Sequence, residues 1–132
     1  MKKVSAFFMG ITAILHILFF KLESIDFMKP ETLKRFGLDE HSGEFVKTWA
    51  FNQGFYNLFL AIGLIYSIFL LFKGNVERGV TLASFILLTI TGAGLVLYIS
   101  VPEKFSAALI QAIPAIIALI TLKISQKNME RL

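Results

Sequence analysis

The chain of 132 residues contains no cysteine, which excludes disulfides and metal sites built on thiolates. It has two histidines, and the one inside an apolar segment, His16, has no second histidine at metal-ligand spacing. No aspartate lies inside a long apolar run, so a Ser–His–Asp triad is not identifiable. No motif for lipidation or phosphate binding occurs. The sequence therefore predicts no metal site and no cofactor.

Apolar side chains are abundant, at 56% of the residues, against about 45–50% in soluble domains. The formal net charge is +4, and most lysine and arginine residues stand at the ends of apolar segments. This distribution is typical of membrane proteins and argues against a nucleic-acid partner. We therefore expect one integral membrane domain, residues 1–132, with the lipid bilayer as its first partner.

Four apolar segments are each near the ~20 residues that cross a bilayer as a helix. They are residues 4–23, 50–72, 79–101 and 105–122. The first begins after two lysines, as a signal peptide does, but no cleavage site of small residues follows, so we expect it to be retained. The turns near Gly74 and Pro102 are short, so successive helices should return antiparallel. The predicted fold is all-α, an antiparallel bundle of four transmembrane helices.

Residues 21–50 form the one long connection, and it is charged throughout. Pro30 suits the first turn of a short helix, and Gly37 suits its end. The residues Asp39-Glu40-His41-Ser42 can cap the start of a helix. They indicate that the next helix begins near Gly43 and projects above the bilayer. We expect this partly helical loop to cap the bundle, with three apolar side chains against the bundle or the membrane interface: Leu33, Phe36 and Leu38.

Lysine and arginine are slightly more numerous on the side of the two termini. Those on the opposite side are diluted by acidic residues of the long loop. This bias predicts a multi-pass protein of the cell membrane with both termini in the cytoplasm.

Polar side chains within the spans gather in one half of the predicted bundle. The motif Asn52-Gln53-Gly54-Phe55-Tyr56-Asn57 opens the second span, and helical spacing puts its four polar side chains on one broad face. The first span ends and the fourth begins on that same side of the membrane. Because lipid penalises polar groups that face outward, we expect them to line one pocket: His16, Glu23, Asn52, Gln53, Tyr56, Asn57, Tyr98 and Gln111.

His16 and Glu23 are the ionisable members of this set, and intramembrane ionisable groups are functional candidates by default. A spacing of seven residues puts them on one stripe of the first helix, about 10 Å apart. They are the candidate catalytic residues, for acid–base chemistry. In a second interpretation, His16 and Gln111 make interhelical hydrogen bonds that only hold the bundle, and Glu23 lies at the membrane interface. Whether the protein is an enzyme stays open.

Several short motifs carry a resemblance: Leu15-His16, Leu22-Glu23, Phe36-Gly37-Leu38, the motif at 52–57, and Gln111 with Pro114-Ala115. With them the chain resembles the small bacterial integral-membrane family known as domain of unknown function thirteen-hundred-and-four, over about residues 5–122. At residues 24–27 it has Ser-Ile-Asp-Phe, where the family usually has an aromatic-rich run ending in Trp. The resemblance implies four transmembrane helices in the bacterial inner membrane and no established activity.

The predicted function is binding of a small apolar or lipid-like molecule in the polar half of the bundle. One alternative is a structural or assembly subunit, in which the polar side chains only hold helices together. A small proton-coupled transporter is less favoured, because Glu23 lies at the end of its helix and not at the midplane. Each of these functions is compatible with a homo-oligomer.

Overall fold

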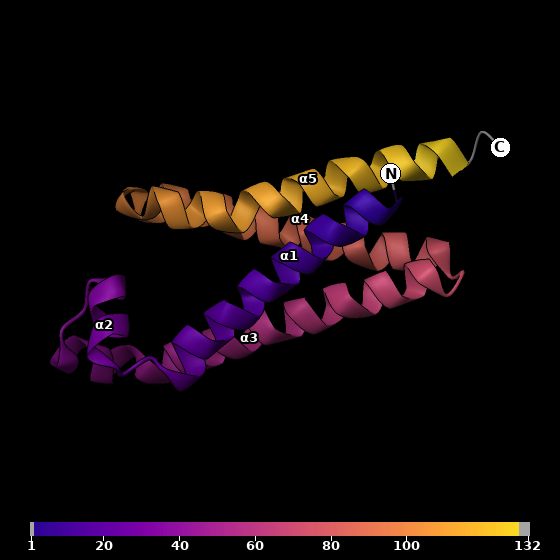
Figure 1. Ribbon diagram of the computed structural model, residues 1–132. Helices are drawn as coiled ribbons and strands as arrows, with labels where there is room; N and C mark the ends of the chain where they lie inside the picture. Colours follow the sequence, from indigo (N-terminus) through magenta and orange to yellow (C-terminus); the bar gives the residue numbers. More distant parts are fainter. Residues whose placement is uncertain (1, 130–132) are drawn as a thin grey trace. The chain divides into compact units, whose positions relative to one another are not determined.

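In the computed structural model, residues 2–129 are described, with side chains through Lys127, and this part of the chain is helical without any strand (Figure 1). The elements follow in the order α1 (Lys2–Phe20), a π-helix (Lys21–Ile25), α2 (Pro30–Phe36), α3 (Glu40–Phe72), α4 (Val76–Ser100), a 3-10 helix (Pro102–Lys104) and α5 (Phe105–Met129).

Four helices are long and apolar enough to cross a membrane, as predicted. These candidate spans are Lys2–Ile25, Glu40–Phe72, Val76–Ser100 and Pro102–Lys127. Each extends beyond the predicted apolar segment, because charged residues continue the helix past the apolar run. The first reaches spanning length because the π-helix prolongs α1.

Helix α3 begins at Glu40, earlier than the predicted start near Gly43. The reason is the cap: the Asp39 carboxylate accepts a hydrogen bond of 2.7 Å from the backbone N–H of Ser42. This contact satisfies a donor that the first helical turn leaves without a partner. With 33 residues, α3 is about 50 Å long, whereas the hydrocarbon core is about 30 Å thick. Helix α3 is therefore longer than one crossing of the hydrocarbon core requires.

The short helix α2 forms where the sequence predicts it. Pro30 occupies its first turn, and Gly37 ends it in the left-handed conformation with φ 77°. The N–H of Leu38 then bonds to the carbonyl of Leu33 at 2.9 Å, which closes a Schellman-type cap. Leu33 is buried against α3, since a Cβ added at Gly43 would lie 2.6 Å from Leu33 Cδ2.

The described chain divides into two compact units. The first joins the start of α1, through Ala13, to the part of the chain from Ile62 onward. The second runs from Ile14 to Ala61 and contains the end of α1, the π-helix, α2 and the first half of α3.

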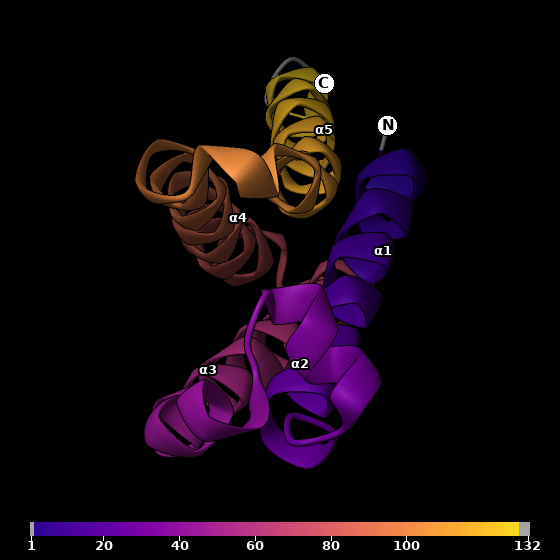
Figure 2. The same ribbon diagram turned by 90° about the vertical axis from the view of Figure 1, so that its left-hand side faces the viewer.

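In the first unit, α4 and α5 lie side by side along much of their length (Figures 1 and 2). A Cβ added at Gly94 would lie 3.0 Å from the Cβ of Ala112 and 3.2 Å from the carbonyl oxygen of Ala108. Gly92, two residues earlier, would meet nothing within 4 Å. Of these two glycines of α4, only Gly94 lies at a close contact with α5.

Candidate functional site

The end of α1 widens into the π-helix Lys21–Ile25, which contains Glu23. The backbone N–H of Asp26 bonds to the carbonyl of Lys21 at 2.8 Å, one residue farther along the chain than in an α-helix. Single π turns occur frequently at functional sites.

Glu23 and Asn57 are joined by a hydrogen bond inside the second unit. Asn57 Nδ2 donates to Glu23 Oε2 at 2.7 Å, and Asn57 is buried. A carboxylate can accept several hydrogen bonds, so Glu23 keeps acceptor capacity beyond this one. The pair fixes the π-helix to α3 and leaves the carboxylate able to hold a second donor.

Close backbone approach beside this pair depends on Gly54. A Cβ there would lie 2.0 Å from Ser24 Oγ and 3.1 Å from the backbone nitrogen of Ser24. Ser24 Oγ in turn donates to the carbonyl of Phe51 at 2.8 Å. Phe55 packs edge-on against Phe20, with ring centroids 5.1 Å apart. The glycine of the polar motif therefore lets the π-helix lie directly on α3.

A hollow of about 310 Å³ adjoins Glu23 in the same unit. Its volume lies at the lower end of the range of about 300–1,000 Å³ for small-molecule sites. Most of its wall is apolar, with the Glu23 carboxylate and the Lys47 ammonium as the charged groups. The lining residues are Glu23, Ser24, Ile25, Phe27, Met28, Lys47, Thr48 and Phe51. An amphipathic molecule fits this combination.

The polar motif is divided between two faces of α3. Asn57 is buried at 7% exposure, whereas Asn52 and Gln53 are exposed and Tyr56 is 64% exposed. Five helical residues turn the direction by about 140°, so Asn52 and Asn57 face different sides. The structure thus brings Asn57 to Glu23 and leaves the other three polar side chains of the motif away from it.

His16 is completely buried. Its ring packs edge-on against Phe19, with centroids 5.4 Å apart. His16 does not line the hollow beside Glu23. Its contact with Phe19 is the kind that a packed core histidine makes.

Tyr98 and Gln111 belong to the first unit. Gln111 Nε2 donates to the backbone carbonyl of Ile90 at 3.3 Å and so connects α5 to α4. Tyr98 is 47% exposed and contacts Phe105, with ring centroids 5.5 Å apart. The Gln111 contact is of the interhelical kind that the second interpretation of the sequence describes.

Ser24 and Lys47 line the hollow although no sequence pattern singles them out. Gly54 offers a usable signal, since a glycine inside a helical pattern indicates close approach of another backbone. The π turn has no comparable signal in the residues 21–25.

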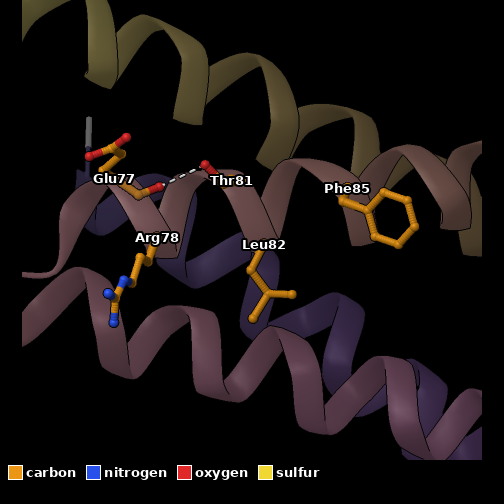
Figure 3. A pocket seen from close by; sticks show the side chains of 5 residues that line it. All are labelled: Glu77, Arg78, Thr81, Leu82 and Phe85. Atoms are coloured by element: carbon orange, nitrogen blue, oxygen red, sulfur yellow. Dashed lines mark hydrogen bonds between the residues drawn. The ribbon is translucent and has the colours of Figure 1, made fainter.

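A larger hollow, of about 700 Å³, lies along α4 in the first unit. Glu77 and Thr81 lie along one side of the helix and Arg78 and Leu82 along the other (Figure 3). The one hydrogen bond drawn joins Thr81 Oγ1 to the backbone carbonyl of Glu77, at 2.9 Å. All the lining residues come from one helix, and their polar groups do not converge on a common point. Volume alone therefore does not make this hollow the better candidate.

Among residues 2–129, no group of three or more histidine, aspartate or glutamate side chains could hold a metal ion.

Comparison with known families identifies one match. The model of the family described as "Protein of unknown function (DUF1304)" matches residues 10–123, most of the chain, and the chain therefore belongs to this family. No curated protein and no solved structure matches the chain.

Proposed function

We propose that this member of the family is a multi-pass membrane protein that binds a lipid-like molecule in the hollow beside Glu23. The observation that carries the proposal is the Glu23–Asn57 hydrogen bond of 2.7 Å at the edge of a mostly apolar hollow. A structural contact alone would not need the adjoining volume of about 310 Å³.

The ligand class follows from the chemistry of the wall. Glu23 favours a hydroxyl or ammonium group, because a carboxylate accepts hydrogen bonds and attracts positive charge. Ile25, Phe27 and Phe51 favour an apolar body. The ligand is thus an amphiphile with a hydrogen-bond donor at its polar end. Any acid–base chemistry would use Glu23, the carboxylate of the hollow.

We further propose that the four spanning helices form an antiparallel bundle. Two contacts within the first unit support this arrangement. The Lys2 ammonium lies 5.0 Å from the ring centroid of Phe72, which puts the start of α1 beside the end of α3. Ser5 Oγ donates to the carbonyl of Ala118 at 3.2 Å, which puts α5 beside the same part of α1.

The proposed location is the bacterial inner membrane, with both termini in the cytoplasm and the loop that contains α2 on the other side. The charge distribution along the chain supports this orientation. The hollow beside Glu23 would then lie near the outer surface of that membrane, next to the loop.

Native mass spectrometry of the purified protein tests the binding proposal. Thr48→Trp fills the hollow beside Glu23, and Thr81→Trp is the matched control in the hollow of α4. We expect one amphiphile per chain in the wild type, the same in Thr81→Trp, and none in Thr48→Trp. Full occupancy in Thr48→Trp, or a wild type that neither carries nor takes up sterols, monoacylglycerols or phospholipids, would overturn the proposal.

A structural or assembly subunit is the second candidate. The hydrogen bond from Gln111 to Ile90 favours it, because it connects two helices and lies in neither of the two hollows described above. In that case the wild type and Thr48→Trp would both be free of ligand, and Thr48→Trp would keep the stability of the wild type.

A further inference from the structure

The hollow beside Glu23 has two opposite charges in a wall whose other residues are uncharged. Glu23 comes from the π-helix and Lys47 from α3, so the two charges belong to different elements of the second unit. Within residues 2–127, no ion pair joins these two side chains. The Lys47 ammonium pairs instead with Glu44, three residues earlier on the same helix. Each of the two charges is therefore able to receive its own group of a bound molecule.

Both charged groups keep bonding capacity for a ligand. Glu23 Oε2 accepts the hydrogen bond from Asn57, and a carboxylate has further acceptor sites beyond one. An ammonium has three donors, so Lys47 can keep Glu44 and still donate to a second acceptor. The Lys47–Glu44 pair is also half-exposed on both sides, and such pairs contribute little to stability. A ligand can thus take part of the Lys47 ammonium at low cost.

The two charges together select among the amphiphiles that the hollow could bind. A cationic amphiphile would compensate Glu23 but would bring a like charge to Lys47, and an anionic amphiphile would do the reverse. A sterol or a monoacylglycerol could hydrogen-bond to either group. It would leave both charges without a counter-charge in a mostly apolar wall, where charges interact more strongly than in water. A molecule with one ammonium and one anionic group compensates both.

We propose that the ligand is a zwitterionic phospholipid whose polar end is phosphoethanolamine, with the ammonium at Glu23 and the phosphate at Lys47. This inference rests on the proposed function, because it names the ligand class of the same site. An ethanolamine ammonium has N–H donors for the carboxylate, whereas the quaternary ammonium of choline has none. A volume of about 310 Å³ is at the lower end for small-molecule sites, so the hollow holds the polar end and the acyl chains extend beyond it.

Competition between phospholipids with identical acyl chains tests the polar end. The purified protein is mixed with equal amounts of ethanolamine, choline and glycerol phospholipids, and native mass spectrometry reads the bound lipid. We expect the ethanolamine lipid to exceed each of the others about ten-fold or more, because each of the others lacks a charged N–H donor for the carboxylate. Equal uptake of the three would overturn this inference and leave the proposed function standing. Uptake of none would overturn both.

Substitution of each charge tests the two contacts separately. Lys47→Gln should weaken binding of the ethanolamine lipid about ten- to hundred-fold, because the phosphate loses its ammonium partner. Glu23→Gln keeps a carbonyl oxygen for Asn57 and should remove the preference for ethanolamine over glycerol lipid. The matched controls Lys34→Gln and Glu31→Gln make the same charge changes on α2, outside the hollow, and should bind as the wild type does. Unchanged binding in Lys47→Gln, or a preference that survives Glu23→Gln, would overturn the assignment.

Soluble glycerophosphoethanolamine distinguishes a lipid from the free polar group, because it has the same polar end without acyl chains. We expect it to displace the bound lipid only at a concentration about a hundred-fold higher or more, since it lacks the apolar contact with Ile25, Phe27 and Phe51. Displacement at equal concentration would show that the hollow binds the polar group alone, and it would overturn the phospholipid as the ligand.

Discussion

Asn57 donates a hydrogen bond of 2.7 Å to the Glu23 carboxylate, and this contact joins the π-helix at the end of the first span to α3. It combines a buried amide with a carboxylate that also borders a hollow. The pair therefore has two consequences, one for stability and one for binding, and they can be measured separately.

Glu23→Ala should lower the free energy of unfolding by about 1–3 kcal/mol, because it leaves the buried Asn57 amide without its acceptor. Asn57→Ala should cost a similar amount. A double-mutant cycle should give a coupling of about 0.5–2 kcal/mol between the two positions. Unfolding of the reconstituted protein in denaturant is the measurement, and Gln53→Ala, at an exposed position, is the control. Additive effects of the two substitutions would contradict the hydrogen bond.

Gly54→Ala should destabilise the second unit by about 1–3 kcal/mol, because the new methyl group would overlap Ser24 Oγ. Adding Ser24→Ala removes that oxygen and should restore part of the loss. The restoration should be incomplete, since the Ser24 Cβ would still lie 3.1 Å from the new methyl group. Thermal unfolding of the two variants side by side is the check, and a Gly54→Ala protein as stable as the wild type would show that the π-helix does not lie on α3.

Two glycines of α4 should respond differently to the same substitution. Gly94→Ala should destabilise the first unit, because its methyl group would lie 3.2 Å from the backbone oxygen of Ala108. Gly92→Ala meets nothing within 4 Å and should be neutral or stabilising by up to about 1 kcal/mol, since alanine favours the helix. Comparison of their unfolding free energies tests the packing of α4 on α5, and the reverse order would exclude it.

The loop after α1 should lose protection in acid. The Lys21 ammonium bonds to Asp26 and, together with Lys29 at 2.9 Å, holds the Asp26 pKa below its ordinary value of 3.8. A depressed pKa contributes stability that is complete above the ordinary value and is lost as the pH falls through the lower one. Amide-exchange protection factors of residues 26–36 should therefore fall below about pH 4. Asp26→Asn should remove this pH dependence, and protection that falls equally in both proteins would contradict it.

Cysteine labelling tests the proposed orientation. Lys3→Cys and Lys127→Cys should react with a membrane-impermeant reagent from one side, and Glu31→Cys from the other. If the chain crosses the membrane an even number of times, its two ends lie on the same side, so positions 3 and 127 must be labelled from the same side. Labelling of positions 3 and 127 from opposite sides would eliminate the arrangement of four crossings.

The sequence by itself determined the features that depend on local chemistry. Long apolar runs predict the four candidate spans, because length and hydropathy decide which helices can cross a bilayer. Pro30 and Gly37 predict the bounds of α2, because each acts on the backbone of its own turn. The family, too, is recognisable from short motifs and is confirmed over residues 10–123.

Only the tertiary structure decided which polar side chains meet. The sequence places Asn52 and Asn57 on one broad face, but packing of the π-helix on Gly54 turns Asn57 inward to Glu23 and leaves Asn52 exposed. In the same way, the packing of α4 on α5 brings Gly94, and not Gly92, into close contact. Hydrophobic pattern could not settle these choices, because the polar side chains of the motif at 52–57 lie on both an exposed and a buried side of α3, and α4 is apolar on nearly every side of its span. Where a helix has no polar face, the shape of its neighbours decides which side is buried.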